Sequence, residues 1–223
     1  MHKLAYLLLP LLALTFAGCP GLLLTPLAII KGTDSPPRYD ILLKGDKRVV
    51  IVPRTAAFNA FEMQTAPQDI ARQVNYLLST RTKNKKLRVV EQQRVEEWLD
   101  NVNNRFDSFI EIGRDRSINA DIVIGFTIVN FQIRDPRNPY LIQGRCVVQV
   151  EAFDVETGRI LATETFTVVN PPNAPMHVTE PGIEQRFRRE FVNVIAQHIA
   201  ALFHPHNPHM LPPMDSDSLN LHR

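Results

Sequence analysis

The sequence lacks a surplus of charge of either sign. Its 223 residues include 25 Lys and Arg against 23 Asp and Glu, which gives a formal charge of +2 at pH 7. Nucleic-acid-binding domains usually concentrate a basic excess on one face, so we expect no nucleic-acid partner. The length and the hydrophobic share of 44% are typical of one domain with a single core and irregular ends.

The motifs of common catalytic sites are also missing. The chain contains no Gly-rich phosphate loop, no H-E-x-x-H helix and no G-x-S-x-G elbow. Asp121 begins a strand-like segment without a second carboxylate or a histidine tied to it by spacing. We therefore predict no catalytic residue, no cofactor and no enzymatic activity. An active site assembled from distant loops stays open as an alternative.

Cysteine occurs only twice, and Cys19 follows a segment with the features of an export signal. Lys3 supplies positive charge, residues 4–14 are apolar, and the small residues Ala17 and Gly18 stand directly before the cysteine. This arrangement resembles the lipobox of bacterial lipoproteins, in which the signal is removed before a cysteine that carries acyl chains such as palmitate. The resemblance implies a signal peptide at 1–18 and lipidation of Cys19.

A lipid on Cys19 would anchor the domain to a membrane, because two or three acyl chains hold stably where one holds only marginally. We predict that residues 19–46, which lack a helical or strand period, form a tether. The competing interpretation is a transmembrane helix over residues 4–30. Five helix-breaking residues interrupt that segment: Pro10, Gly18, Pro20, Gly21 and Pro26.

The second cysteine, Cys146, has no partner within the chain if Cys19 is acylated. It alternates with Val148 and Val150 in a strand-like segment, as a residue that faces a core would. We interpret Cys146 as a small buried hydrophobic residue rather than a reactive thiol.

Hydrophobic periodicity predicts a single α/β domain over residues 47–203, with a mixed sheet, packed helices and the order βαβα(α)βββα. The His- and Pro-rich residues 204–223 are predicted to be a disordered tail. The predicted elements are strand 49–52, helix 65–82, strand 87–91, helix 92–102, a short helix through Ile112 with Asp107 as its N-cap, strand 120–133, a hairpin of 145–155 with 159–169, and a helix after Thr179.

Period-2 alternation makes finer predictions for the strands. Pro53 is expected to end the first strand, and residues 134–144 to form a Pro-containing connection. In strand 120–133, Val129 and Phe131 are expected on the face opposite Ile128. Both faces of this strand are apolar, which is typical of a central strand.

The hairpin has a definite predicted register, because Gly158 in the turn can take a positive φ. This turn places Glu164 on the otherwise apolar face. Two interpretations stay open for Glu164: a functional buried carboxylate, or a strand-edge residue that reaches water. The predicted opposite pairs are Ala152 with Ala162, Val150 with Glu164, and Val148 with Phe166.

Two polar clusters have functional as well as ordinary interpretations. His204, His206 and His209 have a spacing that could hold a transition metal weakly, but a flexible tail would lose entropy in forming that site, and we predict none. Residues 81–88 are the most basic segment. They are interpreted as a solvated turn after a helix, with an anionic-lipid patch as the alternative.

Four segments in order resemble a known superfamily: "RVVIVP", "LRVVEQQRVEEWL", "NADIVIGFTIV" and "VQVEAFDVETGRILATETF". The chain is similar to the periplasmic lipoproteins that include the curli-secretion lipoprotein and the lipoprotein activator of penicillin-binding proteins, with a fold related to the N-terminal domain of the Tol propeller protein. The resemblance covers about residues 47–203 and supplies no catalytic residue. The residues that match its pattern are Ala120, Asp121, Gly125, Asp154, Thr157 and Gly158.

The resemblance implies a lipoprotein on the periplasmic side of the bacterial envelope, by default at the outer membrane. The expected role is a non-enzymatic adaptor or regulator of an envelope assembly, of the cell-wall-synthesis or secretion type, with an envelope protein as partner. Two alternatives stay open: a homo-oligomeric secretion component, and a small-ligand binder or hydrolase with a cleft lined by residues 54–66 and 134–144.

Overall fold

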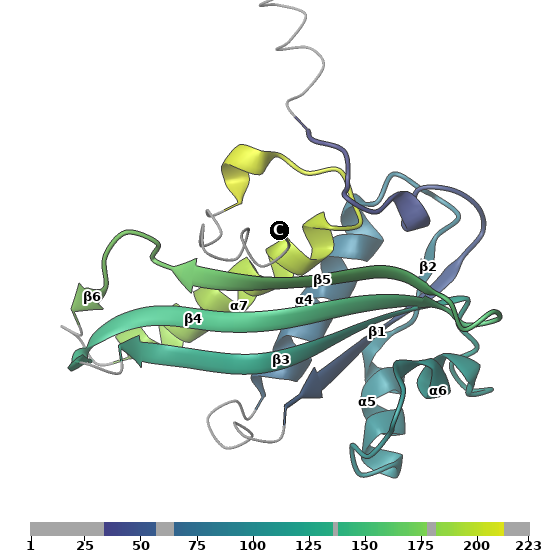
Figure 1. Ribbon diagram of the computed structural model, residues 1–223, viewed down its shortest axis with the longest axis horizontal. Coiled ribbons are helices and arrows are strands. Elements are labelled where there is room, and N and C mark those ends of the chain that lie inside the picture. The colour runs from purple at the N-terminus through teal and green to yellow at the C-terminus, as the bar shows by residue number, and fades with distance from the viewer. Residues whose placement is uncertain (1–33, 57–64, 136–137, 178–181, 212–223) are drawn as a thin grey trace, which may run out of the picture. The chain divides into compact units, whose positions relative to one another are not determined.

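The computed structural model describes residues 34–56, 65–135, 138–177 and 182–211. From Pro36 onward these residues belong to one compact unit, shown in Figure 1. Its helices are α4 (Ala66–Arg81), α5 (Gln92–Asn101), α6 (Phe109–Arg114) and α7 (Ile183–Ala201), with short 3-10 helices at Asp40–Leu42 and Pro208–Met210. Its strands are β1 (Arg48–Thr55), β2 (Arg88–Val89), β3 (Ile122–Asp135), β4 (Asn138–Asp154), β5 (Ile160–Asn170) and β6 (Met176–His177).

The strands form one mixed sheet in the order β2-β1-β3-β4-β5, and β6 pairs with β4 near the start of that strand. β1 runs parallel to both β2 and β3, and β3, β4 and β5 are antiparallel neighbours. The parallel pairs need crossover helices, which α4, α5 and α6 supply, whereas the antiparallel strands follow one another directly. The predicted α/β class, mixed sheet and element order are confirmed.

Helices cover the two faces of this sheet unequally. α4 and α7 lie side by side behind the sheet in Figure 1 and pack on one face, where Val49 and Ile51 join the larger hydrophobic core. α5 and α6 cover only one end of the other face, where Val50 and Val52 join a smaller core. β1 is apolar at consecutive positions because both of its faces are covered.

β1 continues through Pro53, which corrects the prediction that this proline ends the strand. The Val90 backbone N–H donates a hydrogen bond to the Val49 carbonyl, so Val49 directs its backbone groups toward β2. Backbone direction alternates along a strand, and the other odd-numbered residues of β1, including Pro53, therefore face the same side. β2 pairs with β1 only at Arg48 and Val49, so Pro53 lies beyond its end. The missing N–H of the proline therefore removes no ladder hydrogen bond.

A bulge in β3 corrects the predicted facing of its second half. The pairing with β4 shifts between Ile128 and Asn130, which inserts one extra residue. Phe131 consequently joins Ile128 in the larger core, with its ring centroid 5.5 Å from that of Phe191. Val129 is left 41% exposed. Uninterrupted alternation predicted the wrong face for Phe131 because the bulge changes the phase.

The segment 134–144 is mostly strand rather than a loose connection. β3 extends to Asp135 and β4 begins at Asn138, so the two strands continue toward each other, and residues 136–137 lie outside the described part of the chain. Two pairs join β4 to β6, Leu141 with His177 and Ile142 with Met176. This prediction was wrong because Pro139 is the second residue of β4 and lies beside register shifts in the β3–β4 pairing, a position where a strand tolerates a proline.

The β4–β5 hairpin confirms the predicted register. Gly158 has φ +71° in the turn, and all three predicted pairs are observed.

The short helix α6 begins one residue later than predicted, with Ser108 rather than Asp107 as its N-cap. Ser108 and Glu111 form a reciprocal capping box, which satisfies two backbone N–H groups at the helix start.

The packed domain extends beyond both of its predicted ends. Leu42, expected in the tether, is fully buried, and the Tyr39 backbone N–H donates to the Leu202 carbonyl at 2.9 Å. His204, expected in a disordered tail, is only 3% exposed. The described part of the chain continues to residue 211. Leu42 joins the larger core, and the Tyr39 ring lies 6.0 Å from that of Phe203 after α7. Local periodicity does not reveal these contacts. Residues 212–223 lie outside the described part.

Candidate functional site

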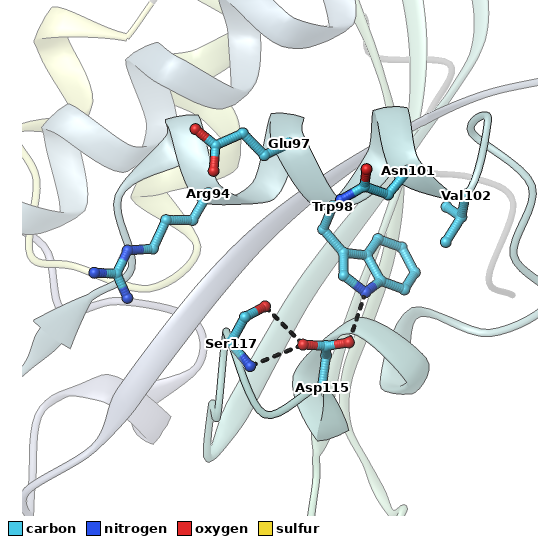
Figure 2. A pocket seen from close by; sticks show the side chains of 7 residues that line it. All are labelled: Arg94, Glu97, Trp98, Asn101, Val102, Asp115 and Ser117. Atoms are coloured by element: carbon cyan, nitrogen blue, oxygen red, sulfur yellow. Dashed lines mark hydrogen bonds between the residues drawn. The ribbon is translucent and has the colours of Figure 1, made fainter.

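A surface hollow of about 430 Å³ lies between α5 and the turn that follows α6. Polar side chains from successive turns of α5 line one side of this hollow. Trp98 points from α5 toward Asp115, in the turn after α6 (Figure 2). The residues that line the hollow are Arg94, Glu97, Trp98, Asn101, Val102, Asp115 and Ser117.

The carboxylate of Asp115 is held by three donors at the floor of the hollow (Figure 2). Ser117 donates its backbone N–H at 2.8 Å and its hydroxyl at 2.6 Å to one oxygen, and Trp98 donates its indole N–H at 3.2 Å to the other. The hydrogen bonds from Ser117, followed by that from Trp98, lower the pKa of Asp115. A carboxylate stabilised in its charged form is a poor proton donor, so this arrangement does not favour Asp115 as a general acid.

Trp98 also begins a chain of aromatic contacts behind the hollow. Its ring meets Phe106 edge-on at 5.8 Å, and Phe106 lies 5.7 Å from Phe109. The guanidinium of Arg54 lies over both phenylalanine rings, at 4.4 and 4.2 Å from their centroids, and donates to the backbone carbonyls of Phe106 and Asp107. These contacts fix the loop between α5 and α6 on the sheet.

A second hollow of about 250 Å³ adjoins the first and shares Arg94 with it. Arg48 and Arg88 are register partners on β1 and β2, so their side chains leave the same face of the sheet. Arg94 approaches from α5, and Glu91 supplies one negative charge to the lining. Three guanidinium groups around one hollow suit an anionic ligand.

A third hollow of about 270 Å³ lies where the end of α7 meets α4 and the chain after it, with His204 and His206 in its lining. Nδ1 of His204 lies 2.6 Å from the Pro205 carbonyl, and the two imidazole rings meet edge-on at 6.4 Å. Among the described residues, no group of three His, Cys, Asp or Glu side chains is placed to hold a metal ion.

An alternative cleft was predicted to be lined by residues 54–66 and 134–144. The described residues of these two segments, 54–56, 65–66, 134–135 and 138–144, are not in the lining of these three hollows. Residues 57–64 and 136–137 lie outside the described part of the chain. Cys19, the predicted lipidation site, also lies outside it.

Cys146 is fully buried on β4 in the larger core, as predicted. Burial raises the pKa of its thiol, because the apolar surroundings disfavour the charged thiolate.

Asp121 and Asp154, which match the superfamily pattern, have structural roles. Asp121 accepts a hydrogen bond from the Arg48 backbone N–H at 2.7 Å. Asp154 accepts hydrogen bonds from the backbone N–H and the hydroxyl of Thr157, at 2.8 Å each. Those two bonds lower the pKa of Asp154.

Glu164 lies on the edge strand β5, but its side chain is only 11% exposed. Arg38 forms an ion pair with it at 3.1 Å, and the Tyr39 hydroxyl lies 3.1 Å from its carboxylate and 2.9 Å from the Thr163 carbonyl. Burial, followed by the contact with Glu164, raises the pKa of Tyr39. Sequence reasoning missed Arg38 and Tyr39; the signal for them was a lone carboxylate on an apolar face, which needs a partner.

Among the described residues, no helix is both long enough and apolar enough to cross a membrane. No protein-family model matches the sequence, and no curated protein is similar to it in sequence.

Several solved structures of bacterial lipoproteins are similar to this chain at low identity. A dodecamer of PelC from Paraburkholderia phytofirmans is 15% identical with a TM-score of 0.44, over 77% of this chain and 99% of that one. Lipoprotein GNA1162 from Neisseria meningitidis is 13% identical with a TM-score of 0.42, over 68% and 99%. The LpoB C-terminal domain from Salmonella enterica is 18% identical with a TM-score of 0.32, over 56% and 84%. Similarity at this level does not assign a function.

Proposed function

We propose that this chain is a lipoprotein, acylated at Cys19 after removal of residues 1–18 and held on the periplasmic side of the bacterial envelope, by default at the outer membrane. The observation that carries this proposal is the charged, apolar and small-residue pattern that ends at Cys19. We also place the chain in the periplasmic lipoprotein superfamily that its strand and hairpin segments resemble; the confirmed hairpin register and element order support this placement.

The tether between lipid and domain is shorter than the sequence suggested. Because Arg38 and Tyr39 already contact β5, only the 18 residues between Cys19 and Arg38 would separate the lipid from the packed domain. Fully extended, such a segment spans at most about 65 Å. The domain would therefore work close to the membrane that anchors it, which suits a partner at that same membrane.

The domain itself acts as a non-enzymatic adaptor or regulator of an envelope assembly, of the cell-wall-synthesis or secretion type. One feature of the sheet supports a role in binding. The face of β4 and β5 beyond α5 and α6 carries polar side chains that are exposed or half-exposed: Gln149, Glu151, Thr163, Thr165 and Thr167.

Mass spectrometry of the chain purified from envelope membranes tests the anchor. We expect a mature N-terminus at Cys19 with the added mass of a diacylglycerol and an acyl chain. An unmodified Cys19 in the membrane fraction would overturn the lipoprotein assignment. A Cys19→Ala variant, as the control, is expected to keep its signal segment and lose the lipid.

In-cell photocrosslinking tests the adaptor role. A photoreactive residue at Thr165, on the polar sheet face, is expected to yield a discrete crosslinked product with another envelope protein. The same residue at Glu190, on the exposed side of α7, is the matched control. Products of the chain with itself alone would instead favour the homo-oligomeric secretion component, and native mass spectrometry would then give the number of copies. No product from either position would contradict the adaptor role.

A further inference from the structure

The positive charge of the domain is concentrated at one edge of the sheet. Eight cations gather around β2, the turn before β1 and the start of α5, and we call this surface the basic edge. Six of them are exposed: Lys44, Lys83, Lys85, Lys86, Arg88 and Arg94. The other two, Lys47 and Arg48, are half-exposed.

The fold brings these cations together from segments about 40 residues apart. The side-chain amide of Asn84, in the loop between α4 and β2, donates to the carbonyls of Leu42 at 3.1 Å and Gly45 at 2.9 Å. Arg88 pairs with Asp46 at 2.8 Å across the same junction. The basic residues 83–88 and the turn at 44–47 therefore form one surface, and Figure 1 shows these segments next to each other beside β2.

The basic edge contains the three-arginine hollow at its sheet end. Arg48, Arg88 and Arg94 line that hollow of about 250 Å³. Within the described residues, no carboxylate forms an ion pair with the guanidinium of Arg48 or Arg94. The hollow thus presents donors to a group from outside the domain.

The charge of this surface contrasts with that of the chain as a whole. Four carboxylates lie among the eight cations: Asp46, Glu91, Asp121 beside Arg48, and Asp154 beside Lys47. The basic edge therefore has a net charge of +4. The whole chain has a net charge of +2, which leaves −2 for all other residues. A chain so nearly neutral overall therefore presents one strongly positive surface.

We propose that the basic edge binds the headgroups of an anionic phospholipid membrane and orients the domain on it. Lysines, which are compact and strongly hydrated, make up most of the exposed part and suit the diffuse charge of a headgroup layer. The arginines of the hollow suit a headgroup phosphate, which guanidinium can bind through two hydrogen bonds. The basic edge also includes the turn at 44–47, which begins six residues after Arg38, where the shortened tether ends.

This inference adds a second membrane contact to the proposed lipid anchor and does not require that anchor. A single weak anchor becomes stable when a basic surface acts with it. The experiment therefore uses the full chain with Cys19→Ser, which cannot be acylated at that position, so that failure of the lipidation proposal leaves this test intact.

Vesicle flotation measures the partition of this chain into two kinds of vesicle: phosphatidylcholine alone, and phosphatidylcholine with about one third phosphatidylglycerol. Any apolar insertion by the N-terminal segment contributes to both, so the ratio of the two partition coefficients reports the electrostatic contact. We expect a ratio far above one at low salt that falls toward one at 0.5 M salt, because added ions screen exposed charges.

The variant Lys85→Gln with Lys86→Gln removes two exposed cations of the basic edge. At about five-fold in affinity for each cation near an anionic surface, we expect the ratio to fall by roughly 30-fold. The matched control is Arg105→Gln with Arg189→Gln, which removes two exposed cations from outside the basic edge. The control is expected to change the ratio by less than two-fold. Circular dichroism of both variants verifies that they are folded.

Three outcomes would overturn the proposal: a ratio near one at low salt, an equal loss in both double variants, or a ratio that salt leaves unchanged. Heparin distinguishes another class of anion. If heparin binds the chain through Lys85 and Lys86 while the two kinds of vesicle bind it equally, the basic edge recognises a soluble polyanion and the membrane assignment is wrong.

Discussion

The two faces of the sheet differ in how much of their length is covered by helices. On the face under α4 and α7, buried side chains continue along β3 and β4 from one end to the other. On the opposite face, Val123 and Gly125 lie under α6, but Thr127 and Val129 farther along β3 do not. Apolar composition follows coverage, so an apolar strand face indicates a helix above it and a polar one indicates a surface for solvent or a partner.

The largest expected effect comes from opening the fully covered face. Phe191→Ala on α7 removes a fully buried ring that packs on Phe131 and Phe187, and we expect a loss of about 3–5 kcal/mol in the free energy of unfolding. Urea denaturation measures it. Arg189→Ala, exposed on the same helix, is the control and should change stability by less than about 0.5 kcal/mol. A loss below about 1 kcal/mol for Phe191→Ala would mean that α7 is not a main cover of the core.

The partly covered face is tested where α6 approaches the sheet most closely. A Cβ at Gly125 would lie 2.4 Å from ring atoms of Phe109, so Gly125→Ala must displace that ring. We expect a loss of about 1–3 kcal/mol. Combining Gly125→Ala with Phe109→Leu should cost less than the sum of the single variants, because the smaller side chain leaves room. Strict additivity in this double-mutant cycle would contradict the close packing.

At the edge strand β5, Glu164 forms an ion pair with Arg38, which lies outside the predicted domain of residues 47–203. Glu164→Gln removes the ion pair with Arg38, and we expect a loss of about 1 kcal/mol because Arg38 is largely exposed. Faster proteolysis before β1 should accompany it, as the segment around Tyr39 loosens from β5. Arg72→Gln, whose ion pair with Glu96 lies away from this edge strand, is the control: its cleavage rate should match that of the wild type.

Acid titration tests the carboxylate in the larger hollow. The pKa of Asp115 is lowered in the folded chain, so this group stabilises the fold above its unfolded pKa, and the stabilisation is lost as pH falls through the folded pKa. Asp115→Asn should therefore reduce stability at pH 7 by less than about 1 kcal/mol and have a smaller effect at pH 2. Thermal unfolding at both pH values measures the difference. An equal effect at both would contradict charge stabilisation by Ser117 and Trp98.

The smallest effect is expected on the uncovered face. Thr165→Val on β5 faces solvent, and we expect a change within about 0.5 kcal/mol. Thr165→Val should nevertheless weaken capture of the proposed envelope partner in a co-purification assay. Substantial destabilisation would instead indicate that another part of the chain covers this face.

Much of the fold followed from local patterns, and the exceptions have definite causes. The β4–β5 register was predictable because a short turn with Gly158 determines which residues oppose each other. The facing of Phe131 was not, since a bulge at Val129 leaves no separate mark in an apolar strand. Of the candidate site, Cys146 was predicted correctly as a buried residue, whereas the hollow at Trp98 and Asp115 depends on how α5 and α6 meet.

The amino-acid sequence by itself determined the order of the elements and the hairpin register, because these depend on residues within a few positions of one another. Only the tertiary structure decided the partners of Glu164, the extension of the domain at both ends and the gathering of cations at the basic edge. Those contacts join residues about 40 to 163 positions apart. Residues so far apart in the sequence meet only when the whole sheet has packed, and no short segment of the sequence predicts that packing.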